Sequence, residues 1–195
     1  MDEEEFWPLI DEALRREAEG GGSGLVAGTA LVRVLVDRLD PGQVVLFSGL
    51  ADEVADRAAT WDLVAVCKLI DGSGSDDAFR DFCDFLVLSG RSVFERAVVD
   101  ADSLAEHPGL VLARRDGLAS SEPINNLAQA AWAQLTGNDD VDDWFDAFPS
   151  VEVPDGGSPE PWPRGTPWES WLKESYEARL PRLFSLIGFG RGERV

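Results

Sequence analysis

Apolar residues recur three and four positions apart along most of the chain, which is the spacing of one face of an α-helix. Residues 2–19 show the pattern most clearly, and similar patterns predict helices over 41–58, 61–70, 123–135 and 138–148, with another beginning after Ser75. Residues 25–39 also suit a strand, because valines alternate at 32, 34 and 36, but the flanking helical patterns favour a helix. The pattern therefore predicts an all-α protein.

Capping residues mark where several of these helices begin. Asp40-Pro41-Gly42-Gln43 combines a capping aspartate, a proline at the first helical position and a glutamine at the third. Thr60 and Ser75 can cap the two helices that follow. Ser103-Leu104-Ala105-Glu106 and Thr166-Pro167-Trp168-Glu169 have the same capping pattern, so we expect helices to begin at both places.

Proline and glycine divide the chain into three parts. Residues 151–166 contain four prolines and three glycines, a composition typical of a linker or an extended arm. We therefore predict an irregular multi-helix domain over 1–150, a Pro/Gly-rich linker or arm over 151–166, and a C-terminal helix over 167–187. We expect this helix to dock on the same domain, although the sequence leaves open a dock on a neighbouring chain.

The charge of the chain narrows the class of partner. Asp and Glu number 37 against 17 Lys and Arg, so the formal net charge is −20. Such a surface repels phosphate backbones, and we expect no binding to nucleic acid. No basic leader opens the sequence and no apolar run approaches the ~20 residues of a bilayer span. We predict a cytoplasmic bacterial protein, with Cys67 and Cys83 as reduced buried thiols.

A Gly- and Ser-rich turn before an aromatic run, residues 72–77, is the most conspicuous candidate site. A calcium loop requires a glutamate at its twelfth position, where Phe82 stands, and a phosphate loop requires a lysine that is missing. A structural role explains the turn better. Ser75 caps a helix, Asp76 and Asp77 complement its dipole, and Arg80 is placed to pair with Asp77 or with an aspartate one turn later, Asp84.

Residues 60–106 carry a resemblance to a known family. They include Trp61-Asp62-Leu63, Ser75-Asp76-Asp77, Gly90-Arg91 and Asp102-Ser103-Leu104, in this order and with glycine and phenylalanine between them. This region, about a quarter of the chain, resembles a bacterial family known as domain of unknown function 4240. The resemblance implies a fold boundary and no mechanism.

The chain departs from the pattern of that family at two positions. Cys83 stands where the family usually has arginine, and Phe85 where it has tryptophan. If the arginine pairs with the aspartates in other members, a site built on such a pair is altered in this chain.

Two classes of function remain open. The favoured one is a non-enzymatic acidic module, regulatory or inhibitor-like, that binds a basic protein; its candidate contact residues are Asp140, Asp142, Asp143, Asp146 and Trp162. The alternative is a carboxylate-based enzyme or small-ligand domain; its candidate residues are Trp61, Asp62, Ser75, Asp76 and Asp77. His107 is the single histidine, so we expect no metal site and no cofactor. The oligomeric state is left open.

Overall fold

The computed structural model describes residues 1–20, 28–72, 75–107, 109–110, 123–149 and 163–188. These residues form ten α-helices and one 3-10 helix, and they contain no strand beyond an isolated bridge between Thr60 and Arg164. The all-α prediction is confirmed. The helices are α1 (Glu3–Glu19), α2 (Gly28–Arg38), α3 (Pro41–Arg57), α4 (Trp61–Asp71), α5 (Asp76–Leu88), α6 (Arg91–Val99), η1 (Ala101–Glu106), α8 (Ile124–Thr136), α9 (Val141–Asp146), α10 (Lys173–Arg179) and α11 (Pro181–Ile187).

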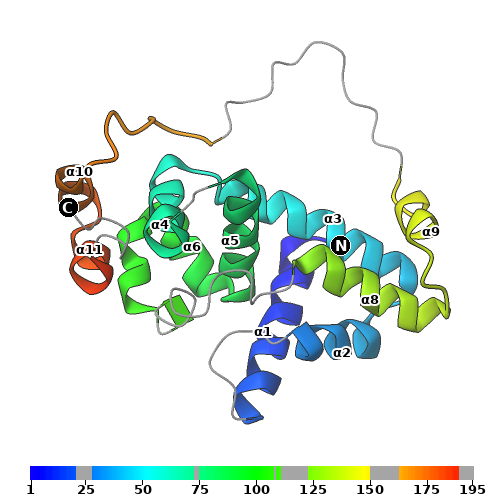
Figure 1. Ribbon diagram of the computed structural model, residues 1–195. Helices are drawn as coiled ribbons and strands as arrows, with labels where there is room; N and C mark the ends of the chain where they lie inside the picture. The colour runs from blue at the N-terminus through cyan, green and yellow to red at the C-terminus, as the bar shows by residue number, and fades with distance from the viewer. Residues whose placement is uncertain (21–27, 73–74, 108, 111–122, 150–162, 189–195) are drawn as a thin grey trace.

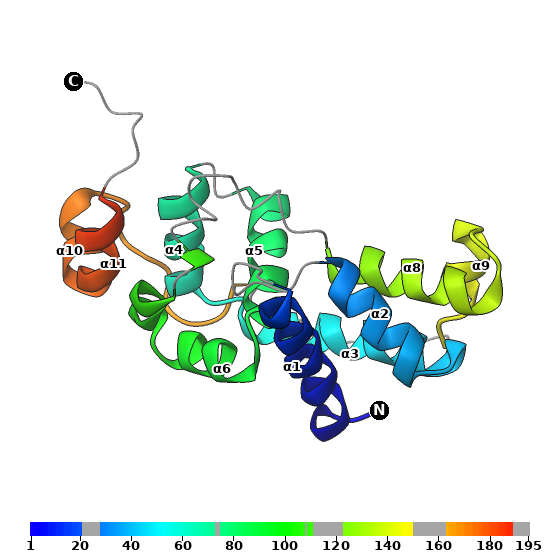
Figure 2. The same cartoon turned by 90° about the horizontal axis from the view of Figure 1, so that it is seen from below.

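The described helices form an elongated assembly with α9 at one end and α10 and α11 at the other (Figures 1 and 2). Helices α1, α2, α3 and α8 pack together beside α9, and α4, α5, α6 and η1 form the other half. Helix α5 contacts both α3 and α4, so it joins the two groups. Helix α11 packs on η1 and α4 at the far end.

A continuous apolar core runs through both groups of helices. The ring of Phe6 in α1 stacks on Phe47 in α3 at 4.9 Å between centroids, and Trp7 lies 5.4 Å from Phe94 in α6. These four side chains are almost completely buried. Within the described ranges no helix has both the length and the apolar content that crossing a bilayer requires.

Three of the predicted caps are present, those at Asp40, Thr60 and Ser75. The Asp40 carboxylate accepts a hydrogen bond of 2.9 Å from the Gln43 amide, and the Gln43 side chain accepts one of 3.0 Å from the Asp40 amide. The Ser75 hydroxyl accepts a hydrogen bond of 3.2 Å from the amide of Ala78. The strand alternative for 25–39 is excluded over 28–38, which are helical.

The other two predicted helix starts are wrong. No helix begins at Thr166, and the next helix starts at Lys173. The predicted start does not form because Trp168 contacts α4 instead, where its indole donates a hydrogen bond to Asp62. The capping box predicted at Ser103 does not form. The 3-10 helix η1 occupies this stretch, and its cap is Asp100. Asp100 accepts a hydrogen bond of 3.1 Å from the Asp102 amide there.

Candidate functional site

The five ligand-site candidates of the sequence lie in two separate places. Trp61 and Asp62 stand in the first turn of α4, whereas Ser75, Asp76 and Asp77 stand at the start of α5. Helix α4, with 11 residues, begins at the first place and runs toward the second, and its length corresponds to a rise of about 15 Å. Asp76 and Asp77 are exposed in the first turn of α5. The fold does not bring the two groups into one pocket.

Asp62 is occupied by the C-terminal part of the chain. Its Oδ1 accepts a hydrogen bond of 2.7 Å from the indole Nε1 of Trp168 and forms an ion pair of 2.7 Å with Arg179. The neighbouring ring of Trp61 lies 6.3 Å from that of Trp171. Both side chains at the start of α4 therefore hold residues 168–179 in place.

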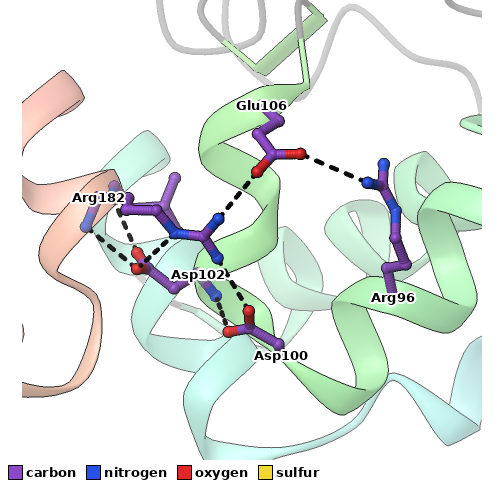
Figure 3. A network of polar contacts seen from close by, with 6 residues as sticks. Arg96, Asp100, Asp102, Glu106 and Arg182 are labelled. Carbon is purple, nitrogen blue, oxygen red and sulfur yellow. Dashed lines mark hydrogen bonds and ion pairs between the residues drawn. The ribbon is translucent and has the colours of Figure 1, made fainter.

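A second group of carboxylates fixes α11 (Figure 3). The guanidinium of Arg182 contacts Asp100 at 2.8 Å, Asp102 at 3.1 Å and Glu106 at 2.9 Å. Asp102 is buried, and its two oxygens also accept hydrogen bonds from the backbone amides of Arg182 and Leu183. Asp102 thus caps the first turn of α11. We interpret the cluster as structural, because its contacts hold α11 against η1.

Arg80 forms its ion pairs across the fold, so the predicted ion pair with Asp77 or Asp84 is wrong for the described residues, although the charge of Arg80 still acts on Asp84. Its guanidinium contacts Asp52 at 2.8 Å and Asp56 at 3.1 Å, both on α3. The prediction considered only neighbours on the same helix, whereas α3 lies against the face of α5 that carries Arg80.

Asp84 is buried between α5 and the start of α8. Its Oδ2 accepts a hydrogen bond of 3.0 Å from the Ile124 amide. Burial raises the pKa of Asp84 to about 6, and the hydrogen bond and the charge of Arg80 oppose that shift. A buried carboxylate in this position supports the N-terminus of α8.

A chain of hydrogen bonds continues from Arg80 along α3 and α8. The side chain of Asn125 donates to both oxygens of Asp52 at 3.2 Å, and its own oxygen accepts a hydrogen bond of 2.6 Å from the buried Ser48 hydroxyl. Helices α3, α5 and α8 are therefore joined by one polar network that passes through Asp52 and ends at Ser48.

Asp52 also opens onto a hollow of about 330 Å³ between α3, α8 and α9. The hollow combines a carboxylate, three carboxamides and three aromatic rings; its lining residues are Asp52, Asn125, Asn126, Gln129, Trp144, Phe145 and Phe148. Helix α9 forms the aromatic wall. Trp144 is buried against Trp132 of α8, with 5.8 Å between the ring centroids.

The outer side of α9 is both apolar and acidic. Phe145 is 64% exposed and Val141 is 51% exposed. Trp144 is the apolar side chain of α9 that is buried. The candidate partner residues Asp140, Asp142, Asp143 and Asp146 line the same helix. Trp162, the fifth candidate of this group, lies outside the described residues.

Among the described residues, the aspartates of α9 have no cationic partner. Asp140 caps the helix and Asp143 accepts a hydrogen bond of 2.7 Å from Asn138, but within the described ranges no basic side chain forms an ion pair with any carboxylate of 139–146. The sequence explains this, because residues 116–163 contain ten acidic side chains and no lysine or arginine.

The remaining chemistry-bearing side chains are buried. Cys67 and Cys83 are buried and are not joined in a disulfide, and burial raises the pKa of Cys83 far above its usual value. Burial also lowers the pKa of His107, which packs edge-on against Phe85. In the part of the chain that the structure describes, no group of three or more metal-binding side chains is placed to hold an ion.

The residues of the hollow are the ones that sequence reasoning missed. Asn125, Asn126 and Gln129 lie three and four positions apart, so they share one face of α8. That polar face at the start of an otherwise apolar helix was a usable signal. No sequence signal placed Asp52, 73 residues earlier, opposite Asn125.

Comparison with known proteins agrees with the resemblance seen in the sequence. A family model described as "Protein of unknown function (DUF4240)" matches residues 1–148, which covers α1 to α9 and confirms the resemblance of residues 60–106. No curated protein and no solved structure matches the chain. The hollow and α9 lie inside the matched region, whereas Trp168, Arg179 and Arg182 lie beyond it.

Proposed function

The chain belongs to the DUF4240 family, and we propose that it is a protein-binding module whose contact surface is α9 together with the hollow beside it. The partner is a basic segment that carries an apolar side chain. One observation carries the proposal: Phe145 and Val141 are exposed on a helix whose aspartates form no ion pair with any basic side chain that the structure describes.

The distribution of ion pairs supports a basic partner. Several carboxylates elsewhere have a cation of their own: Arg16 contacts Glu12 and Asp37, and Arg80 contacts Asp52 and Asp56. The carboxylates of α9 project an uncompensated field. A field of this kind steers a positively charged surface toward the site and makes association salt-dependent.

The exposed side chains supply the binding energy that a field alone does not. An apolar side chain gains about 1.5–3 kcal/mol when it is moved from water into a fully buried position. Phe145 is still mostly in water, at the rim of the hollow and between aspartates. A small apolar centre inside a charged rim is the usual anatomy of a protein contact.

The two cysteines support a place of action in the cytoplasm. Within the described residues Cys67 and Cys83 form no disulfide, as expected for a compartment that keeps thiols reduced. In this proposal the module acts there without catalysis, as a regulator or an inhibitor of its partner.

A short amphipathic peptide of lysine and leucine is the probe that tests the proposed function. The isotope-labelled protein is titrated with this peptide at about 0.01 M and 1 M salt, where the screening length falls from about 30 to 3 Å. We expect the amide signals of α9 and of the first turn of α8 to shift, and the affinity to fall steeply at high salt.

Two matched double variants give the titration its specificity. D142N/D146N removes two charges from α9 and is expected to weaken binding about 2- to 30-fold, as for two exposed ion pairs. D76N/D77N removes two charges from the exposed start of α5 and should leave the affinity unchanged. Equal affinities for the two variants, or shifts confined to other helices, contradict the proposal.

A further inference from the structure

The hollow beside α9 has a chemistry that selects one kind of side chain. We infer that it is a binding site for a guanidinium group, so that an arginine of the partner is the anchor residue. The inference rests on the proposed function and adds the identity of the residue that is recognised.

The inner end of the hollow carries unbalanced negative charge. Asp52 lines it, and its carboxylate is 38% exposed although it contacts Arg80 and Asn125. Arg80 is the basic group of this network and faces three carboxylates, those of Asp52, Asp56 and Asp84. The single positive charge of Arg80 does not balance these three carboxylates. A second cation beside Asp52 is therefore attracted to the site.

The polar wall offers acceptors that nothing else uses. The carboxamides of Asn126 and Gln129 line the hollow, and neither makes a side-chain hydrogen bond within the described residues. Each can turn its oxygen toward a donor without breaking an existing contact. Together with Asp52, these oxygens can accept the several N–H groups of one planar guanidinium.

The opposite wall suits the rest of an arginine side chain. The rings of Trp144, Phe145 and Phe148 line it, and a guanidinium can lie over an aromatic face with a gain of about 0.5–2 kcal/mol. Its methylene stem can pack along the same rings. Of the described residues that line the hollow none is basic, so none of these groups repels an entering cation.

Size and shape favour arginine over the other candidates. A volume of about 330 Å³ is at the lower limit for small-molecule sites, and is sufficient for one long side chain. A lysine ammonium can sit over a ring, as that of Lys68 does 4.4 Å from the centre of Trp171, but it is a compact, strongly hydrated charge that cannot bridge separated acceptors at the same time. A citrulline side chain has the shape of arginine without its charge.

Three capped tripeptides separate these possibilities: Gly-Arg-Gly, Gly-Lys-Gly and Gly-citrulline-Gly. Each is titrated into the labelled full-length chain, and the side-chain signals of Asn126, Gln129 and Trp144 are followed. We expect these signals to shift with the arginine peptide, the lysine peptide to bind about 3- to 10-fold more weakly, and the citrulline peptide to produce no shift. Equal binding of arginine and lysine, or binding of citrulline, overturns the inference.

Variants on α8 provide the matched control. Q129A removes one acceptor from the hollow and should weaken arginine binding several-fold, whereas Q134A removes an exposed carboxamide from the same helix outside the hollow and should have no effect. Equal affinities of Q129A and Q134A for the arginine peptide overturn the inference.

The outcomes for the two proposals are distinguishable. Salt-dependent binding of the lysine–leucine peptide to α9, unaffected when its lysines are replaced by arginines, sustains the proposed function and overturns the arginine site. Arginine-specific shifts in the hollow without any binding of the amphipathic peptide sustain the arginine site and overturn the wider surface.

Discussion

The carboxylate of Asp62 accepts a hydrogen bond of 2.7 Å from the indole of Trp168, 106 residues further along the chain. The same oxygen pairs with Arg179, whose guanidinium in turn lies 4.9 Å from the centre of the Trp168 ring. Trp168 also stacks on Trp171 and meets Tyr176 edge-on. One aspartate at the start of α4 thus organises an aromatic cluster that belongs to the C-terminal segment.

Replacing Asp62 tests how strongly this cluster is held. Asp62→Ala removes both the acceptor and the charge, and we expect the C-terminal segment to lose about 1–2 kcal/mol of local stability. Asp62→Asn keeps an oxygen for Trp168 and loses only a half-exposed ion pair, so its cost should stay below about 1 kcal/mol. Hydrogen exchange of the amides in α10 and α11 measures both. Equal exchange rates in the two variants would show that the indole hydrogen bond contributes nothing.

Asp102 is expected to be less tolerant than its neighbours. The amides of Arg182 and Leu183 donate to different oxygens of its carboxylate, at 3.1 and 2.9 Å. Asp102→Asn turns one oxygen into an NH2 group that faces a backbone N–H, so we expect a loss of about 1–3 kcal/mol. Urea unfolding measures it. Glu106→Gln, on an exposed part of the same cluster, should cost less than about 1 kcal/mol, and an equal loss in both variants contradicts the capping role of Asp102.

The helices that could be predicted from the sequence are those defined by local interactions. The capping box at Asp40 needs only residues three positions apart, and Ser75 needs only the amide of Ala78. The box at Thr166 has the same local chemistry and fails, because the indole of Trp168 gains a partner 106 residues away. Local preference at one helix start is worth about 1 kcal/mol, which a tertiary contact of this kind can exceed.

Of the candidate site, only the part formed by α9 could be predicted from the sequence. The aspartates of α9 and their helix follow from the spacing of Val141 and Trp144, but the hollow behind them joins α3 to α8. Asp84 was expected as a partner of Arg80 on its own helix, whereas it is buried against the amide of Ile124, 40 residues later. Periodicity identifies a helical face and not the element that will cover it.

The start of α5 gives a direct measurement of a purely structural role. Ser75→Ala removes the capping oxygen and should cost about 0.5–2 kcal/mol of stability. Asp76→Asn and Asp77→Asn each remove a first-turn charge and should cost about 0.3–1 kcal/mol. Thermal unfolding of the wild type beside the three variants gives these values. A variant that is more stable than the wild type contradicts the cap, and makes a ligand search at this turn the next step.

Asp84 should make stability depend on pH in a predictable direction. Its pKa in the folded protein is about 6, above the value of about 3.9 for an aspartate in an unfolded chain. Between these values the folded state binds more protons than the unfolded state, so this group lowers stability as the pH rises from about 4 to 6. The shift corresponds to a loss of at most about 3 kcal/mol, complete above pH 6.

The Asp84→Asn variant isolates that term from the other acidic residues. Asparagine keeps an oxygen for the Ile124 amide and cannot ionise, so the difference in unfolding free energy between variant and wild type should grow in favour of the variant from pH 4 to 7. Urea unfolding at a series of pH values measures the difference. Asp77→Asn, on the exposed first turn, serves as the control and should give a difference that changes little over this range. A constant difference for Asp84→Asn as well would mean that the buried carboxylate is already ionised at pH 4, held by Ile124 and Arg80 against the cost of burial.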